Sequence, residues 1–385
     1  MTAPDRLFTR VAKRLEGRVR YWTRPARDGI SNWLACRGSP RFLVLRHRVA
    51  LPSYYREFLG WLGKELPEVR ALFELSTLPC RISDWSRYAL LIPWFPDPFI
   101  HECKPAYLEA KALEARCRGR GVPVINAVDQ ILGASKLLCA RRLAQLGIRT
   151  PHTEPIDDAG AFTRNLAGLR PPLLVREDRA HAGRVPAHLI EKAADAKRIP
   201  WQRLKHPIAV EFIDVRSPRD GLYRKYRYFA AGDDGLAHMV YLSRDWEVRK
   251  GTHIYGETGR MEQIAFSSSP DPNHVRFQQA RRAMGLDFVA FDYSYDREGR
   301  PVVWEANVLP SLHFSPDPQW RYFFPAVKRA MATTARMYFE RAGLPSPACL
   351  QQFLETLNST CSEDAHETHA PSLESPGALP AVRAA

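Results

Sequence analysis

Two carboxylates and an amide fall close together in one stretch of the sequence. Two apolar runs on either side of a turn centred between Glu298 and Gly299 predict a β-hairpin. In that register Asp292 lies directly opposite Glu305, at a separation of ~5 Å. Asn307 follows Glu305 by two residues and therefore faces the same side of the sheet.

A cation is the natural way to accommodate this pair of acids. Two carboxylates at that separation destabilise a sheet unless a proton or a cation offsets them. Carboxylate and amide oxygens suit Mg²⁺ or Mn²⁺ rather than zinc. The pattern predicts a divalent metal site on Asp292, Glu305 and Asn307. A register shifted by one residue would separate the acids.

A second hairpin is predicted from 223–231 and 236–242, with its turn at Gly232–Gly235. Strand alternation places Lys225 and Arg227 on one face, where their charges repel each other. An anion over that face would relieve the repulsion, while a solvated face is the alternative.

The elements that must position these residues alternate between strand and helix. This alternation predicts an α/β domain with a largely parallel sheet, followed by a small α+β unit. The expected strands are 42–45, 88–92, 122–125, 172–176 and 207–213, and the expected helices are 134–147 and a segment near 187–198.

The acidic hairpin resembles the closing signature of the ATP-grasp superfamily, as in glutathione synthetases and D-alanine ligases. The segments Gly285–Asp292 and Val302–Ser311 carry the likeness. It extends over about 126–340, because Asn126 and Ser135-Lys136 precede a helix as they do in the first ATP-binding lobe of that family. The resemblance implies an ATP-grasp fold of two α+β lobes that hold ATP, preceded by a Rossmann-like pre-ATP-grasp domain.

The resemblance also implies roles for individual residues. It makes Asp292, Glu305 and Asn307 the metal ligands. Lys136 and Arg176 would contact nucleotide phosphate, as would Arg184 in the flexible loop 179–184. Glu211, Phe212 and Ile213 would form the hinge that meets adenine, and Arg227, with Lys225, would meet phosphate or acyl phosphate.

Three departures from the family pattern affect the expected chemistry. Arg176 stands where a lysine is usual, and the two side chains differ in reach and geometry. The loop 179–184 has a single glycine, so its backbone amides approach phosphate less closely. Residues 289–291 lack a basic residue that some members carry before the first acid.

The implied activity is an ATP-dependent carboxylate–amine ligase that forms an amide through an acyl phosphate and releases ADP and phosphate. ATP and Mg²⁺ or Mn²⁺ are the implied cofactors. A small-molecule kinase of the same fold and a non-catalytic nucleotide-binding scaffold remain as alternatives. Residues 41–125 and 243–250 are expected to select the substrates, which could be a peptide, an amino acid or a metabolite, and His313 could face them.

Composition limits the other classes of protein. The 385 residues are 45% hydrophobic and 25% charged, which excludes a disordered, collagen-like or coiled-coil chain. No apolar run is long enough to span a bilayer. Seven cysteines without a Cys-x-x-Cys pair indicate a reducing compartment, and the sequence predicts a cytoplasmic protein.

The two ends of the chain have their own character. Residues 1–41 hold ten Lys or Arg against three acidic residues, and apolar positions from Phe8 to Trp22 recur at helical spacing. A basic amphipathic helix is expected, either packed on its own protein or in contact with a membrane or a partner. Nucleic-acid binding is disfavoured because no reading module accompanies the charge. The tail is expected to be disordered.

These features divide the chain into five expected segments. They are a basic arm at 1–40, a pre-ATP-grasp domain at 41–128, a first lobe at 129–206, a second lobe with the metal site at 207–344 and the tail at 345–385. The sequence leaves the oligomeric state open.

Overall fold

The computed structural model describes residues 23–47, 53–95, 103–131, 135–179, 187–310 and 312–367, and every structural statement below concerns these residues. Most of the expected basic arm lies outside them, as does Arg184 in the expected phosphate loop. Among the described residues, no helix combines the length and the apolar character needed to cross a bilayer.

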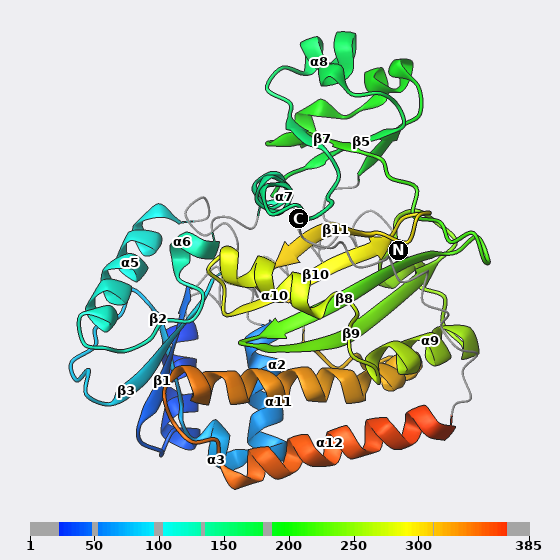
Figure 1. Cartoon of the computed structure of the whole chain (residues 1–385). Helices are drawn as coiled ribbons and strands as arrows, with labels where there is room; N and C mark the ends of the chain where they lie inside the picture. Colours follow the sequence, from blue (N-terminus) through cyan, green and yellow to red (C-terminus); the bar gives the residue numbers. More distant parts are fainter. Residues whose placement is uncertain are drawn as a thin grey trace, which may run out of the picture.

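Three sheets and the helices packed on them form the described structure (Figure 1). The strands are β1 (Arg41–His47), β2 (Phe73–Leu78), β3 (Tyr88–Trp94), β4 (Thr153–Pro155), β5 (Leu173–Glu177), β6 (His188–Ile190), β7 (Pro207–Glu211), β8 (Tyr223–Ala231), β9 (Asp234–Ser243), β10 (Phe288–Tyr295) and β11 (Pro301–Asn307). The α-helices are α2 (Ser53–Glu65), α3 (Pro67–Arg70), α5 (Lys104–Arg118), α6 (Val128–Ile131), α7 (Lys136–Gln145), α8 (Ala159–Asn165), α9 (Glu257–Ser267), α10 (His274–Ala283), α11 (Phe324–Arg341) and α12 (Ala348–Glu367). The 3₁₀ helices are η2 (Leu166–Gly168), η3 (Ala193–Arg198), η4 (Trp201–Arg203), η5 (Lys250–Thr252) and η6 (Pro318–Phe323).

The first sheet is parallel, with strand order β2-β1-β3, and confirms the α/β pattern expected there. β1 is apolar along most of its length because both of its faces are covered. The expected strand 122–125 is reduced to a single parallel bridge between Leu91 and Val124.

The second sheet has the order β4-β7-β5-β6 and is antiparallel throughout. Its core packs Leu173, Val175 and Ile190 against Phe162 of α8. The helix expected near 187–198 is absent from the described part of that segment, which forms β6 and then η3. The prediction was wrong because Ile190 is fully buried beside β5, and strand pairing there satisfies both its apolar side chain and its backbone.

The third sheet carries the acidic hairpin and has the order β11-β10-β8-β9. One face packs on α10, where Phe277 meets Tyr228 and Phe291, and the other packs on α11. The open edge of β9 is covered by Gln263 of α9, whose amide accepts from the N–H of Val240 and donates to the carbonyl of His238. Such cover protects an edge strand from pairing with another chain.

The C-terminal region differs from the expected disordered tail over the part that the structure describes. Residues 348–367 form α12, which packs along α11 (Figure 1). Leu350 is fully buried and Leu354 is 5% exposed, while Phe353 stacks edge-on against Trp61. The tail composition is polar overall, but these apolar residues lie on one helical face, and burying that face stabilises the helix.

Candidate active site

Three charged residues stand in one row across the third sheet. Asp292 on β10 pairs with Glu305 on β11 and, on its other side, with Arg227 on β8. Directly paired residues point to the same face, so the three side chains share it. Asn307 pairs with Ala290 and faces the same way.

A β-bulge sets this register. The predicted pairing of Asp292 with Glu305 is confirmed, but beyond it Tyr293 pairs with Val303, and Trp304 is the extra residue on β11. The Trp304 indole donates to the hydroxyl of Ser294 at 2.8 Å. The bulge therefore shifts the strand pairing near the turn by one residue while the two acids remain opposite each other.

Arg227 binds Asp292 through two parallel hydrogen bonds. Its Nε donates to Oδ1 at 2.6 Å and its Nη2 donates to Oδ2 at 3.0 Å. The side chains are 14% and 4% exposed, so this is a buried, bidentate ion pair. The anion expected over the Lys225 and Arg227 face is thus present within the protein, on the neighbouring strand.

Two lysines complete the charged cluster. Lys225 lies on the same face of β8 as Arg227, with its Nζ 3.5 Å from Oδ2 of Asp292. Lys136, at the start of α7, donates from Nζ to the carbonyl of Asp178 at 3.0 Å and lies 3.8 Å from Oε1 of Glu305. The helix holds Lys136 in place because Ser135 caps its N-terminus, accepting from the N–H of Leu138.

The charges in the cluster stabilise one another in their ionised forms. Burial alone would raise the pKa of Asp292, but the charges of Arg227 and then Lys225 outweigh it and lower that pKa. Burial opposes the charge of Arg227, yet Asp292 raises the pKa of the guanidinium above its ordinary value. With two formal negative and three formal positive charges, the cluster of Asp292, Glu305, Arg227, Lys225 and Lys136 carries an excess of +1 and suits a further anion.

The oxygen atoms of the cluster are also possible ligands for a divalent metal. Among the described residues, no three His, Cys, Asp or Glu side chains gather in a group that could hold one. Asp292, Glu305 and Asn307 nevertheless offer hard oxygen donors on one face. Because Arg227 and Lys225 already neutralise Asp292, the residues fit Mg²⁺ that arrives with a polyphosphate better than they fit the bare ion.

The residues expected in the first lobe lie on β5 and β7. Arg176 alternates with Val175 and Glu177, so it points away from the core that Val175 joins. Glu211 closes β7, and its carboxylate accepts from the N–H of His152 at 3.0 Å, which leaves its side chain engaged with backbone.

Beyond β7, the two other expected hinge residues follow Glu211. Phe212 and Ile213 are half-buried. The Phe212 ring meets Trp246 edge-on, with centroids 6.1 Å apart, and so joins the hinge to the segment expected to select the substrate.

A cationic and aromatic group lies on the other side of Lys225. Its Lys250 belongs to the segment 243–250 expected to select the substrate, whereas Tyr241, Ser315 and Trp320 were not assigned from the sequence. Lys225 lies over the ring of Tyr241, which contacts Trp320 at 6.0 Å between centroids. Lys250 of η5 sits 4.2 Å from the centroid of Trp320 and donates to Ser315 Oγ at 3.1 Å. Cation–π contact and a hydroxyl acceptor hold this ammonium in one place.

His313 borders the same aromatic group, with its ring 6.3 Å from that of Trp320. Burial, followed by the charges of Lys250 and Arg227, lowers the pKa of His313. The lowered pKa favours a neutral imidazole near pH 7.

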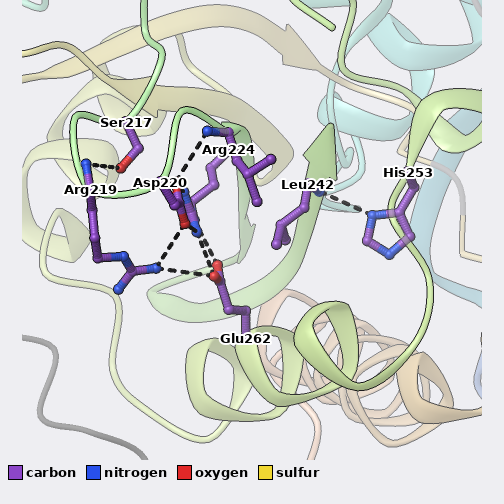
Figure 2. A network of polar contacts seen from close by, with 8 residues as sticks. Ser217, Arg219, Asp220, Arg224, Leu242, His253 and Glu262 are labelled. Atoms are coloured by element: carbon purple, nitrogen blue, oxygen red, sulfur yellow. Dashed lines mark hydrogen bonds and ion pairs between the residues drawn. The ribbon is translucent and has the colours of Figure 1, made fainter. Parts of the chain in front are cut away.

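A separate ion network holds β8 in position at its start. Figure 2 shows Arg224 between the carboxylates of Asp220 and Glu262, with Arg219 reaching both acids. The backbone carbonyl of Arg224 accepts from Ser294 Oγ at 2.6 Å, which ties β8 to β10 one residue away from Lys225. In the same view, the N–H of Leu242 donates to His253 on the edge of β9.

Asn126 fixes the other end of β10. Its side chain accepts from the N–H groups of Asp287 and Phe288 and donates to the Phe288 carbonyl at 2.6 Å. The residue is buried and has a φ of 44°, a left-handed conformation that asparagine tolerates better than most residues. Asn126 therefore joins the parallel-sheet unit to the strand that carries Asp292.

Comparisons with solved structures relate this arrangement to known folds. The VanG D-Ala:D-Ser ligase of Enterococcus faecalis matches 80% of this chain and 99% of its own, with a TM-score of 0.50 and 13% identity. A RimK domain ATP-grasp protein of Sphaerobacter thermophilus matches 78% of this chain and 99% of its own, with a TM-score of 0.47 and 16% identity. The D-alanine–D-alanine ligase of Bacillus anthracis, solved with ATP, matches 85% of this chain and 100% of its own, with a TM-score of 0.45 and 13% identity.

The likeness to the VanG ligase shows that the chain shares the fold of that enzyme. The comparison with protein-family models found no match, and neither did the comparison with the sequences of curated proteins. The fold and its structural neighbours confirm the expected mixed α/β architecture. The Rossmann-like character of the first domain and the five segment boundaries stay predictions.

Proposed function

We propose that this protein is an ATP-dependent carboxylate–amine ligase. The observation that carries the proposal is the row of Glu305, Asp292 and Arg227, flanked by Lys225 and Lys136. It combines oxygen donors for Mg²⁺ with three cations for phosphate oxygens on one face of a rigid sheet. Phosphoryl transfer needs this electrostatic support more than it needs covalent help.

The proposed reaction has two steps. A carboxylate oxygen of the first substrate attacks the γ-phosphorus of ATP, the bond to the β-phosphate oxygen breaks, and ADP leaves. The amine of the second substrate then attacks the acyl carbon, the carbon–oxygen bond to phosphate breaks, and phosphate leaves as the amine gives up a proton. Magnesium, when bound with ATP, would offset the charge on the phosphates beside Asp292, Glu305 and Asn307.

Each part of the cluster has a task in this scheme. Lys136 and Arg176 would hold nucleotide phosphate from the first lobe, with Arg184 added from the adjoining loop. Arg227 and Lys225 would meet the transferred phosphoryl group, because they lie between the acids and Tyr241. The backbone at Glu211, Phe212 and Ile213 would receive the adenine.

The aromatic group beyond Lys225 would receive the carboxylate substrate. Lys250 is held against Trp320 and Ser315 and can pair with an acid, while Tyr241 and Trp320 offer flat apolar surface. A neutral His313 beside them could accept a proton from the incoming amine. These contacts suit a substrate with an apolar portion next to its acid group.

One observation favours a second candidate, a scaffold that binds nucleotide without turnover. Both oxygens of Asp292 are engaged by Arg227, and Lys225 lies beside them. If this ion pair persisted with ATP present, Asp292 would be poorly available to a metal. The kinase alternative has no such observation in its favour.

The test is nucleotide binding followed by turnover. Calorimetry with ATP, with and without Mg²⁺, compares the intact protein with Asp292→Asn and Glu305→Gln. Asp233→Asn and Glu298→Gln are matched controls, because both carboxylates are mostly exposed and lie outside the row. We expect Mg²⁺-dependent binding that weakens at least tenfold in the site variants and is unchanged in the controls.

ADP release with panels of carboxylates and amines then separates the candidates. Release that requires both a carboxylate and an amine supports the ligase. Release that needs no amine identifies a kinase, and metal-dependent binding without release identifies a scaffold. Absence of ATP binding in the intact protein would refute all three.

A further inference from the structure

The helical residues 23–35 are attached to the protein by polar contacts. Arg24 Nη1 donates to the carbonyl of His47 at 2.6 Å. Asp28 is 4% exposed, pairs with Arg46 and accepts from the hydroxyl of Thr77 at 2.5 Å. These contacts place Arg24 and Asp28 on the inner side of the helix.

The next turn of the helix repeats this arrangement. The side-chain amide of Asn32 donates to the carbonyl of Leu75 and accepts from its N–H, both at 2.8 Å. Ser31 Oγ accepts from Arg70 at 2.9 Å. The side-chain amide of Asn32 thus pairs with the backbone of the edge strand β2. The inner face of the helix is polar over three turns.

The outer face of the same helix is apolar. Ile30 is 59% exposed, Trp33 79% and Leu34 58%, and the spacing of three and four residues puts them side by side. We call these three residues the outer patch. A helix on a soluble protein normally buries its apolar stripe and exposes its polar one, so the amphipathicity is reversed here. Covering the outer patch would remove this cost.

The exposed charged residues of this helix and of the residues just after it are positive. Arg27 and Arg37 are exposed on either side of it, whereas Asp28, the one acidic residue between 23 and 37, is buried in its ion pair. A partner that covers the outer patch must therefore tolerate the positive charges of Arg27 and Arg37.

We propose that the outer patch docks this protein on an anionic lipid bilayer. Tryptophan and aliphatic side chains at the interface, bordered by cations, are what a bilayer with acidic headgroups binds. Three side chains are too few for a stable protein interface, which needs about 800 Å² from each partner. A bilayer requires only shallow insertion, because the basic residues supply the remaining attraction. The proposal does not depend on the ligase activity.

The test is co-sedimentation of the full-length protein with vesicles. Phosphatidylcholine vesicles are compared with vesicles containing 30% phosphatidylglycerol, each at low and at high salt. The variants are the triple substitution Ile30→Ser, Trp33→Ser, Leu34→Ser and, as a matched control, Val275→Ser, whose side chain is 68% exposed on α10. Circular dichroism and thermal unfolding verify that the variants are folded. The substituted side chains are exposed, so their replacement should leave the fold intact.

We expect binding to the anionic vesicles, a fall of at least tenfold in the partition coefficient of the triple variant, and no change in the control. High salt should weaken the binding of the intact protein several-fold. Absence of binding by the intact protein would overturn the proposal. Equal binding by the triple variant would also overturn it and would assign the membrane contact to the arm alone. A change in oligomeric state without a change in vesicle binding would overturn it as well and would assign the outer patch to a second copy.

Discussion

Acid should destabilise this protein through His238, a residue buried beneath the charged row. The imidazole is 1% exposed and packs against Phe229, with ring centroids 5.5 Å apart. Burial, followed by the charges of Arg227 and Arg329, lowers its pKa to about 3. An unfolded chain protonates this histidine below about pH 6.5, whereas the folded protein does so only below about pH 3, so stability is lost as the pH falls through that window.

The size of the effect follows from the two pKa values. Each pH unit between them costs about 1.4 kcal/mol, because the unfolded state binds one proton more than the folded state. Between pH 7 and pH 5, His238 should therefore remove about 2 kcal/mol from the free energy of unfolding. The side chain is fully enclosed, so solvent screening does not reduce this value.

The assay compares urea unfolding of the intact protein and of His238→Leu at pH 7 and pH 5. Leucine does not titrate, and every other ionisable group is common to both proteins, so their contributions cancel in the comparison. We expect the intact protein to lose about 2 kcal/mol more than the variant between the two pH values. An equal loss in both proteins would refute the assigned pKa and the role of burial in setting it.

Three further predictions concern the fold and the substrate. Asn126→Ala should lower the free energy of unfolding by about 2–4 kcal/mol, since it leaves buried N–H groups without an acceptor, and a loss below 0.5 kcal/mol would contradict the role of this side chain as a clamp. Leu350→Ala should cost about 2–4 kcal/mol in urea unfolding, with the exposed Gln351→Ala as a near-neutral control, whereas a negligible loss would show that α12 adds no stability. Lys250→Met should raise the KM for the carboxylate substrate at least fivefold and leave the Kd for ATP unchanged, whereas an equal change in both would place Lys250 with the nucleotide.

The acidic hairpin was largely predictable from sequence because its register is a local property. One short turn and two strands of alternating pattern fix the pairing of Asp292 with Glu305. The bulge at Trp304 was not predictable, since its indole is held by Ser294 and that hydroxyl is in turn held by β8. The pairing between the bulge and the turn differs from the predicted one by one residue, while the acids pair as predicted.

The partner of Asp292 could not be predicted in the same way. The sequence placed Lys225 and Arg227 on one face of their own hairpin, but it did not show that β8 lies beside β10. That neighbour relation joins residues 65 apart and depends on packing across the whole sheet. The sequence pattern of the two acids therefore indicates a compensating cation, but it does not indicate that the guanidinium of Arg227 binds one of them.

The C-terminal helix and the β6 segment illustrate the opposite case. Average composition favoured disorder after 345, but the spacing of Leu350, Phe353 and Leu354 was a local signal for a buried helical face. At 188–190 the deciding factor was tertiary, because Ile190 reaches the core only by pairing with β5. Helical propensity is a weak preference that such burial overrides.

Because the charged row draws on separate parts of the chain, binding there should also change the motions of the protein. Lys136, Arg227, Asp292 and Glu305 come from α7, β8, β10 and β11. A nucleotide held by Lys136 and Arg227, with magnesium between its phosphates and the two acids, would oppose openings that separate α7 from β11 or β8 from β10. Bound nucleotide should therefore suppress those sub-global openings and slow amide hydrogen exchange in both lobes together, while the fraying ends of the helices exchange as before.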